Sequence, residues 1–213
     1  MDIRRFAAAS AALMLAMLSV TGCGNKGKSS SSEEAEGVLV PSVDTSVEAA
    51  ADGPKLYFSN AEAAPGEIAE VSLCVKDAAQ KWAMCGIHVS FSEELECQME
   101  DAESRSVKFT KGSASEDSIG AVCMLWQDGL PDKLVQEHLG CLFFTEVFEA
   151  DDGGDGEIVK FYFKVPDNAA SGTEYSVGIY YDPEMDIFIN KANDAAMQAY
   201  VFQNWTAGKI TVK

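Results

Sequence analysis

The side chains of this chain that could carry acid–base, nucleophilic or metal chemistry are few. Among 213 residues there are two histidines, His88 and His138, and six cysteines with no C-x-x-C pair. A structural zinc site is therefore improbable. The sequence contains no G-x-S-x-G, H-E-x-x-H or phosphate-loop motif. The 34 acidic residues will bring some carboxylates together by chance, so a glycosidase pair is a weak signal. These residues favour a binding protein, not an enzyme.

An acidic segment at residues 149–157 has the composition of a calcium loop. Loops of the D-x-D-x-D-G type place oxygen ligands at alternate positions. Here Gly153 occupies the middle ligand position. The segment therefore favours a solvated acidic loop between two strands over a metal site.

A third candidate is a set of aromatic side chains, Tyr180, Tyr181 and Trp205. If exposed, such rings could stack on sugars, and the domain would be a carbohydrate-binding module. The other interpretation places them in the core and at the edges of a β-sandwich, and we favour it. The carbohydrate-binding module stays as the alternative function.

Five cysteines follow residue 23, namely Cys74, Cys85, Cys97, Cys123 and Cys141. The number is odd, so at least one thiol has no partner within the chain. We expect buried, mostly reduced thiols that pack as small apolar side chains.

Residues 1–22 have the pattern of a secretory signal peptide. Arg4 and Arg5 precede an apolar stretch at 6–20, which is shorter than the roughly 20 residues of a membrane-spanning helix. The sequence Val20-Thr21-Gly22-Cys23 resembles the lipobox of bacterial lipoproteins. That resemblance implies a lipid on Cys23, which becomes the first mature residue, and a location at the outer face of the bacterial cell membrane.

Residues 23–53 are predicted to form a flexible tether, because they are rich in Ser, Glu and Ala and nearly free of aromatic residues. The formal net charge of the chain is −18. Binding of nucleic acid requires basic patches on the protein. This charge therefore argues against nucleic acid as a partner and against contact of the domain with anionic lipid.

From residue 54 the chain consists of short runs with period-two alternation. In the clearest, residues 82–91, one face is apolar: Cys85, Ile87, Val89 and Phe91. Other such runs lie at 55–59, 67–76, 106–110, 119–127, 157–165, 173–180 and 209–213. The pattern predicts an antiparallel β-sandwich over residues 54–213. One segment, 131–139, starts with proline and is followed by Gly140, which predicts a short helical insertion.

An ordered series of motifs runs through this domain. The first motifs are the turn and strand at 64–73 and the strand at 83–91, which is followed by Leu-Glu. The later motifs are the strand at 119–126, the strand at 156–165 with its regular spacing of apolar residues, and the closing strand at 207–212. In this order they resemble the cohesin domain of bacterial cellulosome scaffoldins, in its divergent, ruminococcal-like form. The resemblance implies an all-β, nine-stranded jelly-roll sandwich without catalytic activity.

The cohesin resemblance also implies a partner and a binding surface. Cohesins bind the dockerin module of another protein, and the calcium lies in the dockerin, so no cofactor is expected in this chain. The binding surface is one sheet face, built in the family from strands three, five, six and eight. Carried over by position, the docking residues expected here are Met84, Gly86 and His88 on strand three, Ala121, Cys123 and Leu125 on strand six, and Asn193, Ala195 and Met197 in a late loop and strand.

Met84 and Gly86 stand where the best-known cohesins carry Asn and Asp, which implies a more apolar face here. Periodicity alone leaves two possibilities for Met84, His88 and Leu125: an exposed interface, or core positions covered by the 131–139 helix. The resemblance favours the interface. The sequence thus predicts a lipid-anchored cohesin that tethers a dockerin-bearing protein at the cell surface, in support of polysaccharide breakdown.

Overall fold

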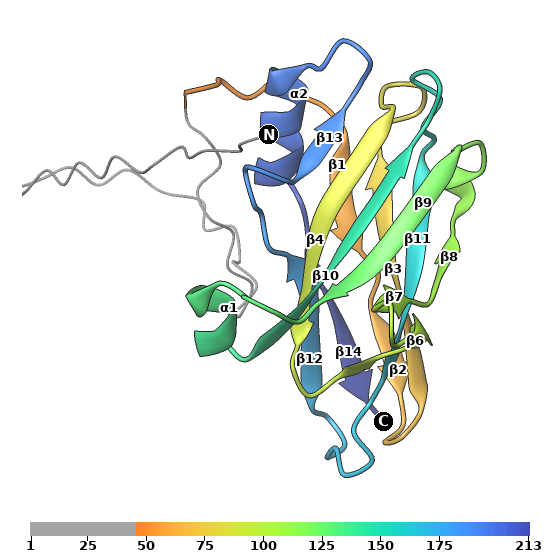
Figure 1. Cartoon of the computed structure of the whole chain (residues 1–213), viewed down its shortest axis with the longest axis vertical. Helices are drawn as coiled ribbons and strands as arrows, with labels where there is room; N and C mark the ends of the chain where they lie inside the picture. The colour runs from red at the N-terminus through yellow and green to blue at the C-terminus, as the bar shows by residue number, and fades with distance from the viewer. Residues whose placement is uncertain (1–45) are drawn as a thin grey trace, which may run out of the picture. The chain divides into compact units, whose positions relative to one another are not determined.

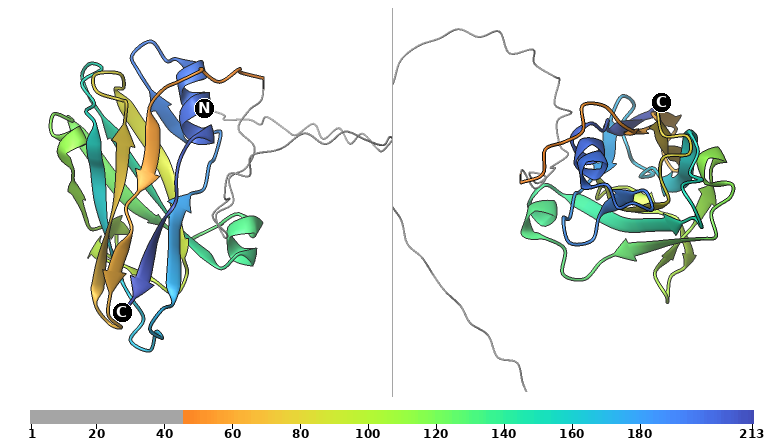
Figure 2. Two further views of the ribbon diagram at one scale, coloured as in Figure 1. Left: turned by 180° about the vertical axis from the view of Figure 1, so that it is seen from behind. Right: turned by 90° about the horizontal axis from the view of Figure 1, so that it is seen from above.

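The computed structural model describes residues 46–213; the predicted signal peptide, Cys23 and most of the tether lie outside the described residues. The described chain folds into a sandwich of two mainly antiparallel β-sheets (Figures 1 and 2). The predicted all-β sandwich with a short helical insertion is confirmed.

The smaller sheet has five strands. Its order is β1 (Lys55–Phe58), β3 (Ile68–Lys76), β11 (Gly156–Lys164) and β5 (Glu96–Cys97), and β8 (Phe109–Lys111) also pairs with β11.

The larger sheet has nine strands. Its order is β2 (Ala61–Ala63), β14 (Gly208–Val212), β12 (Glu174–Ile179), β4 (Met84–Ser92), β10 (Leu139–Val147), β9 (Gly120–Trp126), β7 (Ser106–Val107) and β6 (Met99–Asp101), and β13 (Ile187–Ile189) also pairs with β4. The described residues thus hold more strands than the nine of the implied jelly roll, because several edge segments are only two or three residues long.

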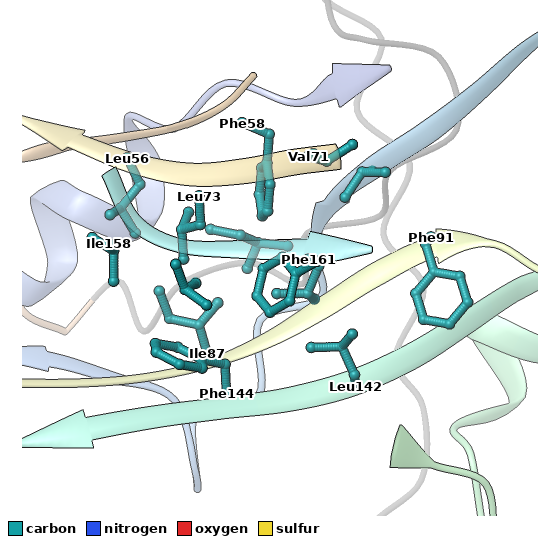
Figure 3. Close-up of a cluster of buried hydrophobic side chains, with 14 of the residues drawn as sticks. Leu56, Phe58, Val71, Leu73, Ile87, Phe91, Leu142, Phe144, Ile158 and Phe161 are labelled. Carbon is teal, nitrogen blue, oxygen red and sulfur yellow. The ribbon is translucent and has the colours of Figure 1, made fainter. Parts of the chain in front are cut away.

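The core lies between the two sheets, where their inward side chains meet (Figure 3). The predicted apolar face of β4 points into it, and Cys85, Ile87 and Val89 are fully buried. The Phe144 ring from the larger sheet meets the Phe161 ring from the smaller sheet edge to face, with 6.0 Å between centroids. Such aromatic pairs add stabilisation beyond their buried area.

Strand β10 was not predicted from the sequence. Its run Leu-Gly-Cys-Leu-Phe-Phe-Thr-Glu-Val is apolar on both sides and lacks clean alternation. The reason is that Leu142 and Phe144 point into the core, while Cys141 on the opposite side lies under a helix. A strand covered on both faces reads as a short continuous apolar run.

Two α-helices accompany the sheets. Helix α1 (Asp132–Gln136) follows Pro131, as predicted. Helix α2 (Ala195–Gln203) corrects the prediction of a loop and strand in this region. Asp194 Oδ1 accepts hydrogen bonds from the backbone N–H groups of Ala196 and Met197, and good helix formers follow this N-cap. Helix α2 lies beside β13 and β1 (Figure 1) and buries its apolar side chains in the core.

The five cysteines of the domain are free and buried, as predicted. Burial raises the pKa of each thiol, for Cys97 to about 12. A thiol in this state is not a nucleophile near neutral pH.

The acidic loop after β10 packs as part of the structure. Asp155 Oδ1 accepts a hydrogen bond of 2.6 Å from the backbone N–H of Ala78, and Asp151 Oδ1 accepts one of 2.7 Å from that of Lys191. The backbone of Gly153 lies so close to the Trp82 ring that a Cβ would stand 2.2 Å from it. Across residues 46–213, no group of three or more His, Cys, Asp or Glu is arranged to hold a metal ion.

Glu146 is an ionisable residue that is buried inside the domain. It points inward from β10, is 1% exposed, and accepts a 2.6 Å hydrogen bond from Ser115 Oγ. Its other carboxylate oxygen makes no hydrogen bond of normal geometry among the described residues. Burial raises the pKa of Glu146 from 4.5 to about 7, against the smaller lowering effects of the Ser115 and Ser118 hydroxyls and of the Lys111 charge.

We expect Glu146→Gln to remove a pH dependence of stability. The folded pKa exceeds the unfolded one, so the contribution of Glu146 is full below pH 4.5 and is lost as the pH rises through 7. At about 1.4 kcal/mol per pKa unit, the loss is about 3 kcal/mol. Urea unfolding of both proteins at pH 4.5 and 8 measures it. A stability difference between variant and wild type that is the same at both pH values would contradict the prediction.

Candidate docking face

The candidate site is the outward side of the larger sheet, where four strands lie next to one another. Antiparallel pairing aligns Ile187, Gly86, Thr145 and Val122 in one row across β13, β4, β10 and β9. The next row joins His88, Phe143 and Met124. We call the outward residues of these strands the outer face: Met84, Gly86, His88, Phe143, Thr145, Val147, Gly120, Val122, Met124, Trp126, Ile187 and Ile189.

Large apolar side chains of the outer face are open to solvent. Val122 is 52% exposed and Met124 is 44% exposed, side by side on β9. Met185, in the loop that precedes β13, is 51% exposed, and its carbonyl oxygen lies over Gly86. Contiguous exposed apolar patches on folded domains are typical of interaction surfaces.

His88 lies at the centre of the outer face but is only 2% exposed. Its ring contacts Phe143 on one neighbouring strand and Trp126 farther across, with centroid distances of 4.7 and 4.8 Å. Its Nδ1 lies 2.7 Å from Asp186 Oδ1. Asp186 is 1% exposed, and burial raises its pKa although the hydrogen bonds from His88 oppose this.

Gly86 lets the chain before β13 approach the sheet. A Cβ at this position would stand 3.2 Å from Ile187 Cγ1, 3.4 Å from Phe143 Cζ and 3.6 Å from the Met185 carbonyl oxygen. A larger side chain would therefore push Met185 and Ile187 outward.

Helix α1 covers the other end of the same sheet surface (Figure 1). Leu134 of α1 is fully buried and clusters with Leu139 and Cys141, and the partly buried side chains Trp126, Leu130 and Tyr180 pack against them. Neither sequence-based alternative describes all three residues for which it was posed: Met84 is partly exposed, His88 is buried on the outer face, and Leu125 packs against the core from the inward side. The helix covers the end near Cys141, and the region around Val122 and Met124 is open.

The prediction for β9 was wrong by one residue. Cys123, expected to face outward, is 1% exposed in the core, and Ala121 and Leu125 pack against the same core. The outward residues are their neighbours, Val122 and Met124 among them. Both alternating sets of this strand are apolar because its outer side is apolar too, so hydrophobicity could not select the face.

The other predicted site residues are only partly brought together. Met84, Gly86 and His88 do point outward from β4, but only Met84 is partly exposed. Asn193 and Ala195 are exposed at the start of α2, off the strands of the outer face, and Met197 is buried in the core.

Three outer-face residues of β10 were missed with their strand, namely Phe143, Thr145 and Val147. A short apolar run rich in aromatic residues, between a helix signal and an acidic turn, is the signal that could have revealed them.

Ser90, His88 and Asp186 have the residue types of a hydrolytic triad but not its arrangement. Ser90 is 1% exposed, and its Oγ has no hydrogen-bond partner in the part of the chain that the structure describes. A triad needs a bond between nucleophile and base at a site that substrate can reach. The three side chains are therefore packing and structural groups.

The aromatic candidates for sugar binding pack into the domain. Tyr181 is 3% exposed and its ring lies 4.5 Å from that of Phe202. Tyr180 packs beneath α1, and Trp205 packs against the main core. Their placement agrees with the core-and-edge interpretation.

No protein-family model and no curated protein matches the sequence of this chain. Solved structures do match. A type III cohesin module from the cellulosomal ScaE cell-surface anchoring scaffoldin of Ruminococcus flavefaciens has 23% identity and a TM-score of 0.62, covering 84% of this chain and 96% of that one.

Two structures from Acetivibrio cellulolyticus are also similar. The third ScaC cohesin, in complex with the ScaB dockerin mutated in its C-terminal helix, has 15% identity and a TM-score of 0.53 over 75% of this chain and 98% of that one. The sixth cohesin of scaffoldin B, in complex with a dockerin mutant, has 12% identity and a TM-score of 0.52 over 76% of this chain and 100% of that one. The chain therefore has the cohesin fold, as the resemblance implied.

The orientation of β9 can be tested by two neighbouring substitutions. Cys123→Asp puts an unpaired charge into the core and should lower the free energy of unfolding by about 3 kcal/mol or more. Met124→Asp, at an exposed position, should change it by no more than about 0.5 kcal/mol. Urea unfolding of the two variants measures the difference, and a larger loss in Met124→Asp would reverse the orientation.

Proposed function

We propose that this chain is a non-catalytic docking protein that binds a dockerin module through the outer face. The observation that carries the proposal is the pair of half-exposed side chains, Val122 and Met124, on the open part of a sheet in a cohesin fold. Two of the similar cohesins are in complex with dockerins, which supports this class of partner.

The binding would be driven by burial of the exposed apolar side chains of the outer face. Val122, Met124 and Met185 offer a patch that helices of a dockerin can cover, and burying each side chain contributes roughly 1–2 kcal/mol. Unbranched methionine side chains adapt to the shape of a partner. Calcium would reside in the dockerin.

Acidic residues border this patch. Glu116 and Asp117 precede β9, Glu149 follows β10, and Glu184 is next to Met185; all four are exposed. A partner with basic residues around an apolar centre fits this rim, and charge complementarity of this kind acts mainly on the association rate.

We expect the double substitution Val122→Asp/Met124→Asp to weaken dockerin binding at least tenfold, or about 1.4 kcal/mol, because it places charges on the open apolar part of the outer face. Calorimetry with a panel of dockerin modules from the same genome measures the effect. Ile68→Asp is the matched control, since Ile68 is 51% exposed on the smaller sheet.

The control should bind like the wild-type protein. Wild-type protein that binds none of the dockerins would refute the proposed function, and equal binding by the double variant would place the interface elsewhere.

We further propose that the lipid on Cys23 holds this domain at the outer face of the bacterial membrane, with residues 23–53 as a tether. No helix within residues 46–213 is long and apolar enough to span a bilayer. Two or more acyl chains anchor a protein stably. The chain would then hold a dockerin-bearing protein at the cell surface, in support of the breakdown of polysaccharide such as cellulose.

Cys23→Ser should move the protein from the membrane fraction to the soluble fraction, because serine cannot carry the thioether-linked lipid. Fractionation of cells that express each form, with labelled palmitate as the probe, measures this. Cys74→Ser is the control and should stay membrane-bound and labelled. A Cys23→Ser protein that still incorporates palmitate and stays in the membrane fraction would contradict the anchor.

A further inference from the structure

The loop between β12 and β13 is fastened to the sheet by one buried side chain. We propose that Asp186, together with His88, is a positioning pair that holds Met185 at the edge of the outer face in a shape ready for docking. This inference rests on the proposed function and assigns to His88 a role beneath the interface, not a contact with the partner.

Asp186 joins strand β4 to the loop with both of its carboxylate oxygens. Oδ1 accepts hydrogen bonds from the backbone N–H of His88, at 3.0 Å, and from its ring Nδ1, at 2.7 Å. Oδ2 accepts a bond of 2.9 Å from the backbone N–H of Asp182. Asp186 is 1% exposed, and its carboxylate accepts three hydrogen bonds. These bonds hold strand β4 and the loop together, as expected for a buried polar group.

The loop itself closes around Asp182. The backbone carbonyl oxygen of Asp182 accepts hydrogen bonds from the N–H groups of Met185, at 3.1 Å, and Asp186, at 2.8 Å. The Asp182 side-chain Oδ1 accepts a hydrogen bond from the N–H of Glu184, at 2.9 Å. The turn from Asp182 to Asp186 is thus a compact unit, and the Met185 side chain at its tip remains half exposed.

His88 cannot itself present much surface to a partner. Its ring is 2% exposed and contacts the rings of Phe143 and Trp126, and its Nδ1 is engaged by Asp186. A buried polar pair gains little stability over apolar side chains, since desolvation opposes it. Apolar side chains could fill this space, but they could not accept the Asp182 N–H and so fix the loop.

Asp186→Asn tests the pair with almost no change of shape. The amide oxygen can still accept the bonds from His88, but the amide NH₂ then faces the N–H of Asp182, donor against donor. The loop should loosen while the sandwich stays folded. Met185→Ala removes only the side chain that the loop presents.

Using the dockerin of the panel that binds the wild-type protein most tightly, we expect Asp186→Asn and Met185→Ala each to weaken binding by about tenfold. If the pair acts through Met185, the double variant should lose no more than about twentyfold, instead of the roughly hundredfold loss of independent effects. Asp167→Asn is the control, because it makes the same change of an acid to an amide at an exposed position after β11 of the smaller sheet, and it should change affinity by less than about threefold.

Hydrogen exchange of the free protein supplies a second measurement that needs no partner. In Asp186→Asn the amides of Asp182, Glu184, Met185 and Asp186 should exchange faster, and those of β3 and β11 should be unchanged. Wild-type affinity in Asp186→Asn or in Met185→Ala, multiplicative losses in the double variant, or unchanged loop exchange would each overturn the proposal. Absence of binding by the wild-type protein refutes the proposed function instead, and the exchange measurement then still decides whether Asp186 holds the loop.

Discussion

Strand β10 pairs with β4 on one side and with β9 on the other, and this double pairing determines the rest of the structure. The ladder with β4 runs from Leu139 to Val147, and the ladder with β9 from Cys141 to Val147. Because side chains alternate along a strand, a shift of one residue would exchange the core set for the outward set on every strand in contact. The pairing therefore decides at once that Leu142 and Phe144 fill the core and that Phe143 and Thr145 face outward.

The outward side of this sheet is apolar over much of its length, which an isolated domain would avoid. One end is covered by α1, whose Leu134 is fully buried, and the edge along β4 by β13 and the loop that Asp186 fastens. What is left open is the region of Val122 and Met124. An incomplete cover of this kind is the expected form of a surface whose remaining cover is another protein.

Much of the fold could be predicted from the sequence. The clean alternation of β4 gave the correct core face, Pro131 marked the start of α1, and the order of motifs indicated the cohesin fold. Strand β10 escaped prediction because it is apolar on both sides. Helix α2 escaped because residues 195–203 are mostly apolar and show no apolar stripe with the helical period.

The candidate site was harder to predict, for a physical reason. A docking surface is apolar and so resembles the core, which made the two faces of β9 indistinguishable by hydrophobicity. The burial of His88 depends on Asp186, a residue 98 positions away in the sequence, and no local pattern contains that contact.

In the proposed complex a dockerin covers the open part of the outer face. The most direct test of this contact is methyl NMR of protein labelled at methionine and isoleucine, titrated with a dockerin module. The methyl signals of Met124 and Met185 should shift on binding, while that of Ile68 on the smaller sheet should stay unchanged. Shifts at Ile68 with Met124 and Met185 unaffected would contradict the account.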